Sequence, residues 1–362
     1  MDRKKDGEVA SKCFKKKETK MRFVLLYNCP MKNCDKVWLY NGLKKYADVK
    51  IIPVFTTKTY FRISLIMPKI RFGEVPVYFL TFLRSIIAIF LSSKNDIIVT
   101  WSNTQGFMIE SLCRRLRIKR KIVSFMWIRV PNKCIDMFKK SFENENFMPI
   151  VNNKNLETEF KEVFRLEKWN GFFLPDVFDE MDGFKKPIYR SKKYIFAGGF
   201  NNRDWDVLLK VVKETPNMDY IIVCDKNAIK DGVRLPNLTI DEKIPIEKYH
   251  TLMSEAFVTI CPLKENTTSG LINILKSAQF GIPCISTRLD VTAMYYSDSM
   301  GKLLYNRNDE KDLKKKILYL YSRGEKEYSE IAEDFQKHIR KNFAPEENVN
   351  KLIKELKKRK WV

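Results

Sequence analysis

The sequence alternates short apolar, strand-like runs with longer helical stretches, and it does so in two separate series. The strand-like runs that open the two series are RFVLLYN (22–28), VKIIPVF (49–55), YIFAGGF (194–200) and DYIIVCD (219–225). Alternation at this spacing is typical of βαβ units whose strands lie parallel in one sheet. We therefore predict an α/β protein with two Rossmann-like, doubly wound domains that face a central cleft.

The domain boundaries follow from chain length and from breaks in this rhythm. A chain of 362 residues is long for one hydrophobic core. We predict five parts: a disordered basic tail (1–20), an N-terminal domain (21–180), a linker rich in Gly, Pro and charge (181–193), a C-terminal domain (194–345) and a C-terminal helix (346–362). For that helix, packing back onto the N-terminal domain is one of the expected arrangements.

The chain is strongly basic, with 67 Lys and Arg against 44 Asp and Glu and a net charge of +23. A field of this sign attracts nucleic acid, anionic lipid headgroups or phosphorylated substrates, and it does not choose among them. One basic run, RRLRIKRK, carries six basic residues in eight. It is either a phosphate or anionic-lipid contact or a solvated helix end.

Cysteine and histidine usage excludes several kinds of site. The eight cysteines form no CxxC pair, and several lie within apolar runs, a pattern typical of reduced, buried thiols in a cytosolic protein. The chain has only two histidines. A metallohydrolase or a triad hydrolase is therefore not expected.

The most apolar segment is VPVYFLTFLRSIIAIFLSS (75–93), which interrupts its hydrophobic run with Arg84. We interpret it as a buried or interface-lying helix in preference to a membrane-spanning one. The N-terminal residues have no apolar core, so no signal peptide is expected.

A polar turn, ENTTSG, lies between an apolar run and a helix with an apolar stripe. Two interpretations stay open from this stretch alone. Thr268 or Ser269 caps the helix, or Gly270 lets an anion approach the N–H groups at the partly positive helix end. Asn273 and Lys276 lie three residues apart on the polar side of that helix.

A second glycine turn, FAGGFNNRDW, has the same order of strand, Gly198 and Gly199, polar loop and helix start. Arg203 stands at that helix start, where a cation opposes the helix dipole at a cost of about 0.3–1 kcal/mol. It is either an ordinary surface residue or a contact for a phosphate. The DWD that follows matches a DxD metal motif, but it falls in the first helical turn, where Asp is favoured; we predict no metal there.

Three segments, in this order, resemble the C-terminal half of GT-B glycosyltransferases: YIFAGGFNNRDWDVLLKVV, IPIEKYHTLMSEAFVTICPL and TTSGLINILKSAQFGIPCIST. The nearest type is the retaining family 4, which uses nucleotide-sugar donors. The resemblance covers residues 194 to about 345 and includes the glycine turn, a Pro-x-x-x-Tyr helix, the Ser-Gly turn, a Gly-x-Pro and a helical tail. The N-terminal half resembles the same family only in its alternation of strands and helices and in the segment FFLPDVFDE.

The resemblance implies a retaining glycosyltransferase that needs no metal ion or other cofactor. It would move a sugar from a nucleotide-sugar donor, bound by the C-terminal domain, to a saccharide or lipid-linked saccharide acceptor on the N-terminal domain. Arg203 and Glu265 would be catalytic. The donor-binding residues would be Gly198, Gly199, Asn202, Thr268, Ser269, Gly270, Asn273 and Lys276.

Two departures from the family pattern stand out. The usual LEA run, whose glutamate holds the ribose hydroxyls, reads LKS here, so Lys276 replaces an acid. A lysine donates hydrogen bonds but cannot accept them. Glu265 also lies farther from the helix than usual, and the usual spacing lands on Thr268.

The expected setting is cell-surface polysaccharide or glycan biosynthesis, in the cytoplasm and peripheral to an anionic inner membrane face. Two alternatives remain: a GT-B protein that binds nucleotide-sugar with weakened activity, and a basic nucleic-acid-binding protein. The second is disfavoured because no RNP, helix-turn-helix, KH or zinc signature occurs.

Overall fold

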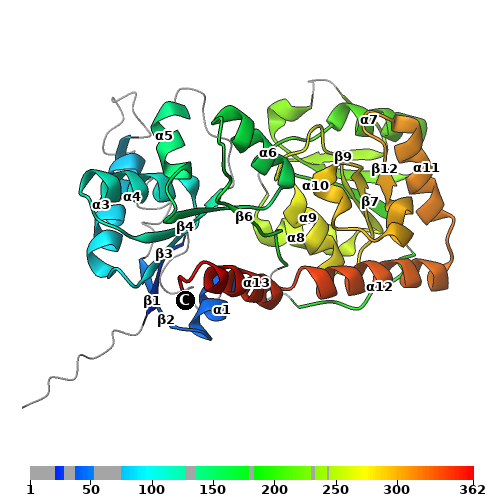
Figure 1. Cartoon of the computed structure of the whole chain (residues 1–362). Helices are drawn as coiled ribbons and strands as arrows, with labels where there is room; N and C mark the ends of the chain where they lie inside the picture. The colour runs from blue at the N-terminus through cyan, green and yellow to red at the C-terminus, as the bar shows by residue number, and fades with distance from the viewer. Residues whose placement is uncertain are drawn as a thin grey trace, which may run out of the picture.

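The protein is described by a computed structural model that covers residues 21–27, 37–52, 75–126, 135–178, 183–191, 193–229, 233–242 and 244–362. The predicted tail, 1–20, lies outside the described residues. Figure 1 shows two α/β units side by side, with the blue to green part of the chain in one and the yellow-green to orange part in the other.

The N-terminal unit contains one parallel sheet of six strands. These are β1 (Arg22–Leu26), β2 (Asp48–Ile52), β3 (Ile97–Thr100), β4 (Lys121–Met126), β5 (Phe147–Val151) and β6 (Phe172–Phe173). Their order in the sheet is β2-β1-β3-β4-β5-β6. The central strands are apolar and buried along their whole length because helices cover both faces of the sheet. Strand β6 is only two residues long, and Pro175, which follows it closely, has no N–H to donate to a ladder.

The C-terminal unit repeats this architecture. Its strands are β7 (Tyr194–Gly198), β8 (Asp219–Val223), β9 (Leu238–Asp241), β10 (Val258–Cys261), β11 (Cys284–Thr287) and β12 (Leu304–Tyr305). Their order is β12-β11-β10-β7-β8-β9, and all pairs are parallel. The predicted fold class, two doubly wound α/β domains, is therefore confirmed.

Helices connect the strands and cover the sheets. In the N-terminal unit they are α1 (Trp38–Lys44), α3 (Val75–Leu91), α4 (Asn103–Arg115), α5 (Ile135–Phe142) and α6 (Lys154–Val163). In the C-terminal unit they are α7 (Trp205–Glu214), α8 (Ile246–Glu255), α9 (Leu271–Gln279), α10 (Asp290–Ala293), α11 (Glu310–Tyr321) and α12 (Glu325–Asn342).

Each sheet has a point where the strand order reverses. In the N-terminal sheet it lies between β1 and β3, and in the C-terminal sheet between β7 and β10. The loops that leave two such strands run to opposite faces of the sheet and open a crevice at their carboxyl ends. These two crevices are the expected ligand sites of the fold.

The last helix, α13 (Pro345–Lys358), returns from the C-terminal unit to the N-terminal one (Figure 1). Its apolar side chains Val349, Leu352, Ile353 and Leu356 belong to the same core cluster as β1 and α1. Asn348 donates a hydrogen bond to the carbonyl of Pro175, with 2.6 Å between the atoms. The chain therefore crosses between the two units a second time, which ties them together.

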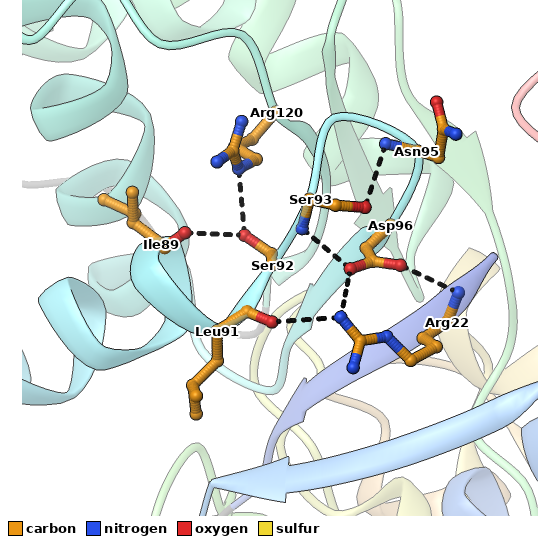
Figure 2. A network of polar contacts seen from close by, with 8 residues as sticks. All are labelled: Arg22, Ile89, Leu91, Ser92, Ser93, Asn95, Asp96 and Arg120. Carbon is orange, nitrogen blue, oxygen red and sulfur yellow. Dashed lines mark hydrogen bonds and ion pairs between the residues drawn. The ribbon is translucent and has the colours of Figure 1, made fainter. Parts of the chain in front are cut away.

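Helix α3 lies on the N-terminal unit. The side chain of Arg84 is buried, and its Nη2 donates to the carbonyl of Ile52 at 2.9 Å. The C-terminal end of α3 is anchored by Asp96, which accepts bonds from the Arg22 side chain and backbone and from the Ser93 backbone (Figure 2). Among the described residues, no helix has the length and hydropathy needed to cross a membrane.

The cysteines that the structure describes behave as small apolar residues. Cys113, Cys224, Cys261 and Cys284 are buried and unpaired, as predicted. Burial raises the pKa of Cys113 and of Cys224 to about 11, so both thiols stay protonated near neutral pH.

Candidate functional site

The two glycine turns predicted from sequence lie together in the structure. One follows β7 and the other follows β10, and these strands are neighbours at the point where the strand order reverses. Two backbone hydrogen bonds join the turns: Asp204 N donates to Pro262 O at 2.8 Å, and Lys264 N donates to Asn202 O at 3.2 Å. Two segments about sixty residues apart in sequence therefore form one site.

The guanidinium of Arg203 lies between these two turns. Its Nε donates to the carbonyl of Gly198 at 3.0 Å, and its Nη1 to the carbonyl of Asn201 at 2.7 Å. A Cβ at Gly199 would lie 2.2 Å from Nη2, and one at Gly270 would lie 2.9 Å from Nη1. Only 6% of the arginine is exposed. The alternative of an ordinary surface arginine is therefore wrong.

Both glycines also adopt backbone conformations that other residues avoid. The φ angle is +130° at Gly199 and +98° at Gly270, in the left-handed half of φ space, where a Cβ causes strain. The glycines thus provide the turn geometry and the room for the guanidinium at once.

The N-terminus of α9 opens onto the same place. Its N-cap residue is Gly270, which has no side chain to cap the helix. The hydroxyl of Ser269 donates to the carbonyl of Asn201 at 3.0 Å. The prediction of Thr268 or Ser269 as the N-cap residue is therefore wrong, because Gly270 takes that position and Ser269 braces the neighbouring turn. The N–H groups of the first turn of α9 carry the partial positive charge of the helix end. The N–H of Ser269 itself points to the hydroxyl of Thr267 in a long, 3.4 Å contact.

Asn202 holds the polar turn in shape. Its amide exchanges two hydrogen bonds with the backbone of Glu265: Nδ2 donates to the carbonyl at 2.8 Å, and Oδ1 accepts from the N–H at 3.0 Å. Nδ2 also donates to the Thr267 hydroxyl at 2.7 Å. Glu265 itself is exposed. The structure therefore gives Asn202 a bracing position, and it places the side chain of Glu265 at the open edge of the turn.

Asn273 and Tyr249 close the site from the side of α8. The Asn273 amide donates to the carbonyl of Gly198 and to the hydroxyl of Tyr249, at 2.9 Å in both cases. A Cβ at Gly198 would lie 2.2 Å from that hydroxyl. Burial raises the pKa of Tyr249 to about 12 despite the nearby charge of Arg203. Tyr249 had no role in the sequence analysis, although its place in the Pro-x-x-x-Tyr helix was a usable signal.

The aspartates of the DWD run belong to the start of α7. Asp204 is its N-cap residue, and its carboxylate accepts from the N–H of Val207 at 3.3 Å. Asp206 is exposed in the first turn. Within the described ranges, no group of three or more His, Cys, Asp or Glu side chains converges as a metal site.

A cavity of about 510 Å³ lies between the two units, next to this site. From the C-terminal unit it is lined by α8 and α9, including His250 and Lys276. Lys276 is only 7% exposed, and its Nζ lies 6.0 Å from the ring centroid of Phe280. The structure therefore places the residue that replaces the expected acid in the wall of the interdomain cavity.

Aromatic residues form the opposite wall of this cavity. Tyr27 follows β1, Trp101 follows β3, and Phe125 lies near the end of β4. The ring centroid of Trp101 is 4.4 Å from that of Tyr27 and 4.8 Å from that of Phe125. This cluster stands at the reversal point of the N-terminal sheet. Sequence reasoning missed it, although each residue stands at or near the end of an apolar, strand-like run.

A partly buried acid, Asp176, also lines the cavity. Burial raises its pKa to about 6, although a hydrogen bond from Asn152 Nδ2 at 3.0 Å favours the charged form. In the unfolded chain the pKa is near 4. The folded state therefore binds the proton more tightly than the unfolded chain does. Because of this, the free energy of unfolding falls as the pH rises from about 4 to above 6.

Replacing Asp176 with asparagine is expected to remove this cost, because the amide oxygen keeps the bond from Asn152. The difference in the free energy of unfolding between the variant and the wild type should grow by about 2 kcal/mol, in favour of the variant, from pH 4.5 to pH 7.5. This follows from 1.36 kcal/mol per pKa unit. Urea unfolding followed by circular dichroism at both pH values measures the difference. If the variant and the wild type differ in stability by the same amount at both pH values, the raised pKa of Asp176 is contradicted.

Comparisons with known proteins agree on the fold. No protein-family model and no curated protein sequence matches the chain. Among solved structures, the chain is similar to trehalose-6-phosphate synthase of E. coli bound with UDP-2-fluoro glucose, with a TM-score of 0.66, 10% identity and coverage of 93% of this chain and 99% of that one. A glycosyltransferase from Rickettsia africae gives a TM-score of 0.67, 13% identity and coverage of 94% and 99%. Sucrose-phosphate synthase of Thermosynechococcus elongatus gives a TM-score of 0.65 and 11% identity, with coverage of 93% of this chain and 98% of that one. The chain has the GT-B fold.

Proposed function

We propose that this protein is a glycosyltransferase that moves a sugar from a nucleotide-sugar donor to a saccharide or lipid-linked saccharide acceptor. The reaction is retaining and independent of metal ions, and it serves cell-surface polysaccharide or glycan biosynthesis in the cytoplasm, at the inner face of a membrane. The structural neighbours support the donor class, since one of them is bound with UDP-2-fluoro glucose and others are named as synthases of sugar phosphates.

One observation carries the proposal: a buried arginine held between two glycine turns, beside a helix whose N-cap residue is a glycine. A diphosphate brings two negative groups that match a planar guanidinium and a set of backbone N–H donors. Both donors are fixed before a ligand arrives, because Arg203 is bonded to two carbonyls and α9 is packed in the core.

The same groups fit the chemical step. When the bond between the sugar and the diphosphate breaks, negative charge develops on the departing diphosphate. Fixed donors and a permanent cation stabilise that charge in the transition state more than in the ground state. In this scheme the departing phosphate helps to deprotonate the acceptor hydroxyl. Asp204 is occupied as a helix cap, and this supports a scheme in which cations of the chain replace a metal ion.

The acceptor is assigned to the aromatic wall of the cavity. Ligand pockets are lined mostly by apolar and aromatic side chains with a few polar groups that fix orientation. Trp101 offers such a surface at the carboxyl end of β3, opposite α9. In this proposal the acceptor binds the N-terminal unit and the donor binds the C-terminal unit.

Replacing Trp101 with alanine is expected to raise the KM for the acceptor about tenfold and to leave donor binding unchanged, because Trp101 lies in the other unit from Arg203. Replacement with phenylalanine should retain most of the activity. Transfer rates at varied acceptor concentration, with the donor-induced thermal shift as control, measure both effects. A variant that loses donor binding as well would contradict separate donor and acceptor walls.

A panel of UDP-, GDP- and CMP-sugars tests the proposed function directly. Incubation with the correct donor should raise the melting temperature and produce free nucleoside diphosphate or monophosphate, even without an acceptor. No response to any nucleotide-sugar would contradict the proposal. A second function, donor binding with weakened transfer, is favoured by Lys276 in the place of an acid. It would show as a thermal shift without turnover when acceptors are supplied.

A further inference from the structure

The outward face of α3 is apolar from Phe79 to Phe90. Its exposed large side chains and their exposed fractions are Phe79 (58%), Phe82 (38%), Leu83 (37%), Ile87 (45%) and Phe90 (81%). With 100° between successive residues of a helix, these five fall within one stripe. The opposite side carries the buried residues Thr81, Arg84, Ser85, Ala88 and Ile89. The helix thus packs on the protein with one face and presents phenylalanine and isoleucine with the other.

Basic side chains gather at the C-terminal end of this helix. They are exposed and come from the end of α4 and the loop after it: Arg114, Arg115, Arg117 and Lys119. Helix α4 packs along α3. Arg120 Nε donates to the hydroxyl of Ser92 at 3.0 Å, which fixes this loop against the end of α3 (Figure 2). Leu116, in the middle of the run, is 57% exposed.

Residues 75–126, from the start of α3 to the end of β4, offer no exposed acid to oppose this charge. Residues 75–126 contain two acids, Asp96 and Glu110, and both are buried. Asp96 is bonded to Arg22 and Ser93. Glu110 accepts from Ser141 and from Arg114. The positive rim is therefore left without local neutralisation by this segment, apart from the pairing of Arg114.

We propose that the outward face of α3 and this basic rim form a docking surface for an anionic lipid bilayer. An apolar helical stripe next to arginines and lysines matches a headgroup layer that covers an acyl core. Exposed large apolar side chains gathered on one helix mark an interaction site and differ from scattered ones. The surface lies on the N-terminal unit and is separate from the groups around Arg203, so docking does not depend on the proposed transfer reaction.

The charge of the rim favours a bilayer over a second copy of the chain. A two-fold symmetric dimer through the α3 face is self-complementary, so it brings like surface patches together. Both basic rims would then border one interface, and residues 75–126 of the second copy offer no exposed acid to pair with them. Anionic headgroups neutralise the same residues.

Flotation of the purified full chain with vesicles tests the proposal without any sugar substrate. Vesicles of phosphatidylcholine with 30% phosphatidylglycerol should carry the protein upward at low salt, and vesicles of phosphatidylcholine alone should carry little. The triple variant Arg115→Glu, Arg117→Glu, Lys119→Glu should bind about a hundredfold more weakly, at roughly 1 kcal/mol per basic residue. The triple variant Phe79→Ser, Ile87→Ser, Phe90→Ser should bind at least tenfold more weakly.

Matched controls lie on the C-terminal unit. Lys311→Glu, Lys315→Glu, Lys326→Glu changes the net charge equally at exposed positions, and Leu318→Ser removes an exposed apolar side chain. Both controls should float as the wild type does. Three results would overturn the proposal: a wild type that stays in the soluble fraction, a charge control that loses binding as much as the rim variant, or a dimer that dissociates on Phe90→Ser with no vesicle binding. Donor turnover in the wild type is measured separately, so failure of docking and failure of the proposed function are distinguishable.

Discussion

Replacement of Arg203 with alanine is expected to lower donor turnover by about a hundred- to a thousandfold. That range is typical when one fixed donor to a developing negative charge is removed from an active site. The effect should appear in kcat more than in KM, because the charge on the diphosphate grows in the transition state. Steady-state release of the nucleotide product, with the donor identified from the panel, measures it.

Two further variants keep this experiment decisive. Arg203→Lys retains the charge but loses the planar, two-pronged geometry, so an intermediate loss of roughly tenfold is expected. Lys264→Ala removes an exposed cation from the same polar turn and should change turnover by less than about threefold, because surface charges are screened by solvent. Full activity in a folded Arg203→Ala protein would remove the arginine from the mechanism.

Replacement of Gly199 with alanine is expected to damage both the fold and the site. The new Cβ would lie 2.2 Å from Nη2 and 2.6 Å from Cζ of Arg203, at a φ of +130°. Strain at such a position costs on the order of 1–3 kcal/mol. The displaced guanidinium should weaken donor binding by more than tenfold. Urea unfolding and donor-induced thermal shift measure the two losses.

Other glycines of the chain separate the two causes. Gly183 has a φ of +60°, and a Cβ there would meet none of the described residues within 4 Å, so Gly183→Ala reports strain alone. Gly324 has neither a positive φ nor a close neighbour among the described residues, so Gly324→Ala should be close to neutral. The combination of Gly199→Ala with Arg203→Ala should cost less activity than the sum of the two, since they act on one contact. Strict additivity of their effects on turnover would contradict the pairing of the glycine with the arginine.

Local patterns identified most of the elements of the second half. The Pro-x-x-x-Tyr helix of the sequence analysis is α8, and the apolar runs after it are the buried strands β10 and β11. The sequence predicts these elements because their apolar periodicity and the residues that mark their ends lie within or directly beside each element. The two-residue strand β12 was missed, since such a short run carries no periodicity of its own.

The sequence predicts only part of the candidate site. Two glycine turns and Arg203 were identified as candidates, each with a structural alternative that the local sequence could not decide. Burial of Arg203 and the position of Gly270 as the N-cap residue of α9 decided both. Tyr249 and the aromatic wall around Trp101 were not identified, because their importance depends on residues brought together from distant parts of the chain.

The sequence by itself determined that the chain has two α/β series, glycine turns at the ends of two strands and a large basic excess. These are properties of neighbouring residues, and backbone sterics and hydrophobic periodicity express them locally. Only the tertiary structure decided that β7 and β10 are adjacent and that β1 and β3 are adjacent. Strand order is set by which buried faces pack together across the whole chain, so no short stretch encodes it. That order places Arg203 between two glycine turns and sets an aromatic wall across the cavity from α9.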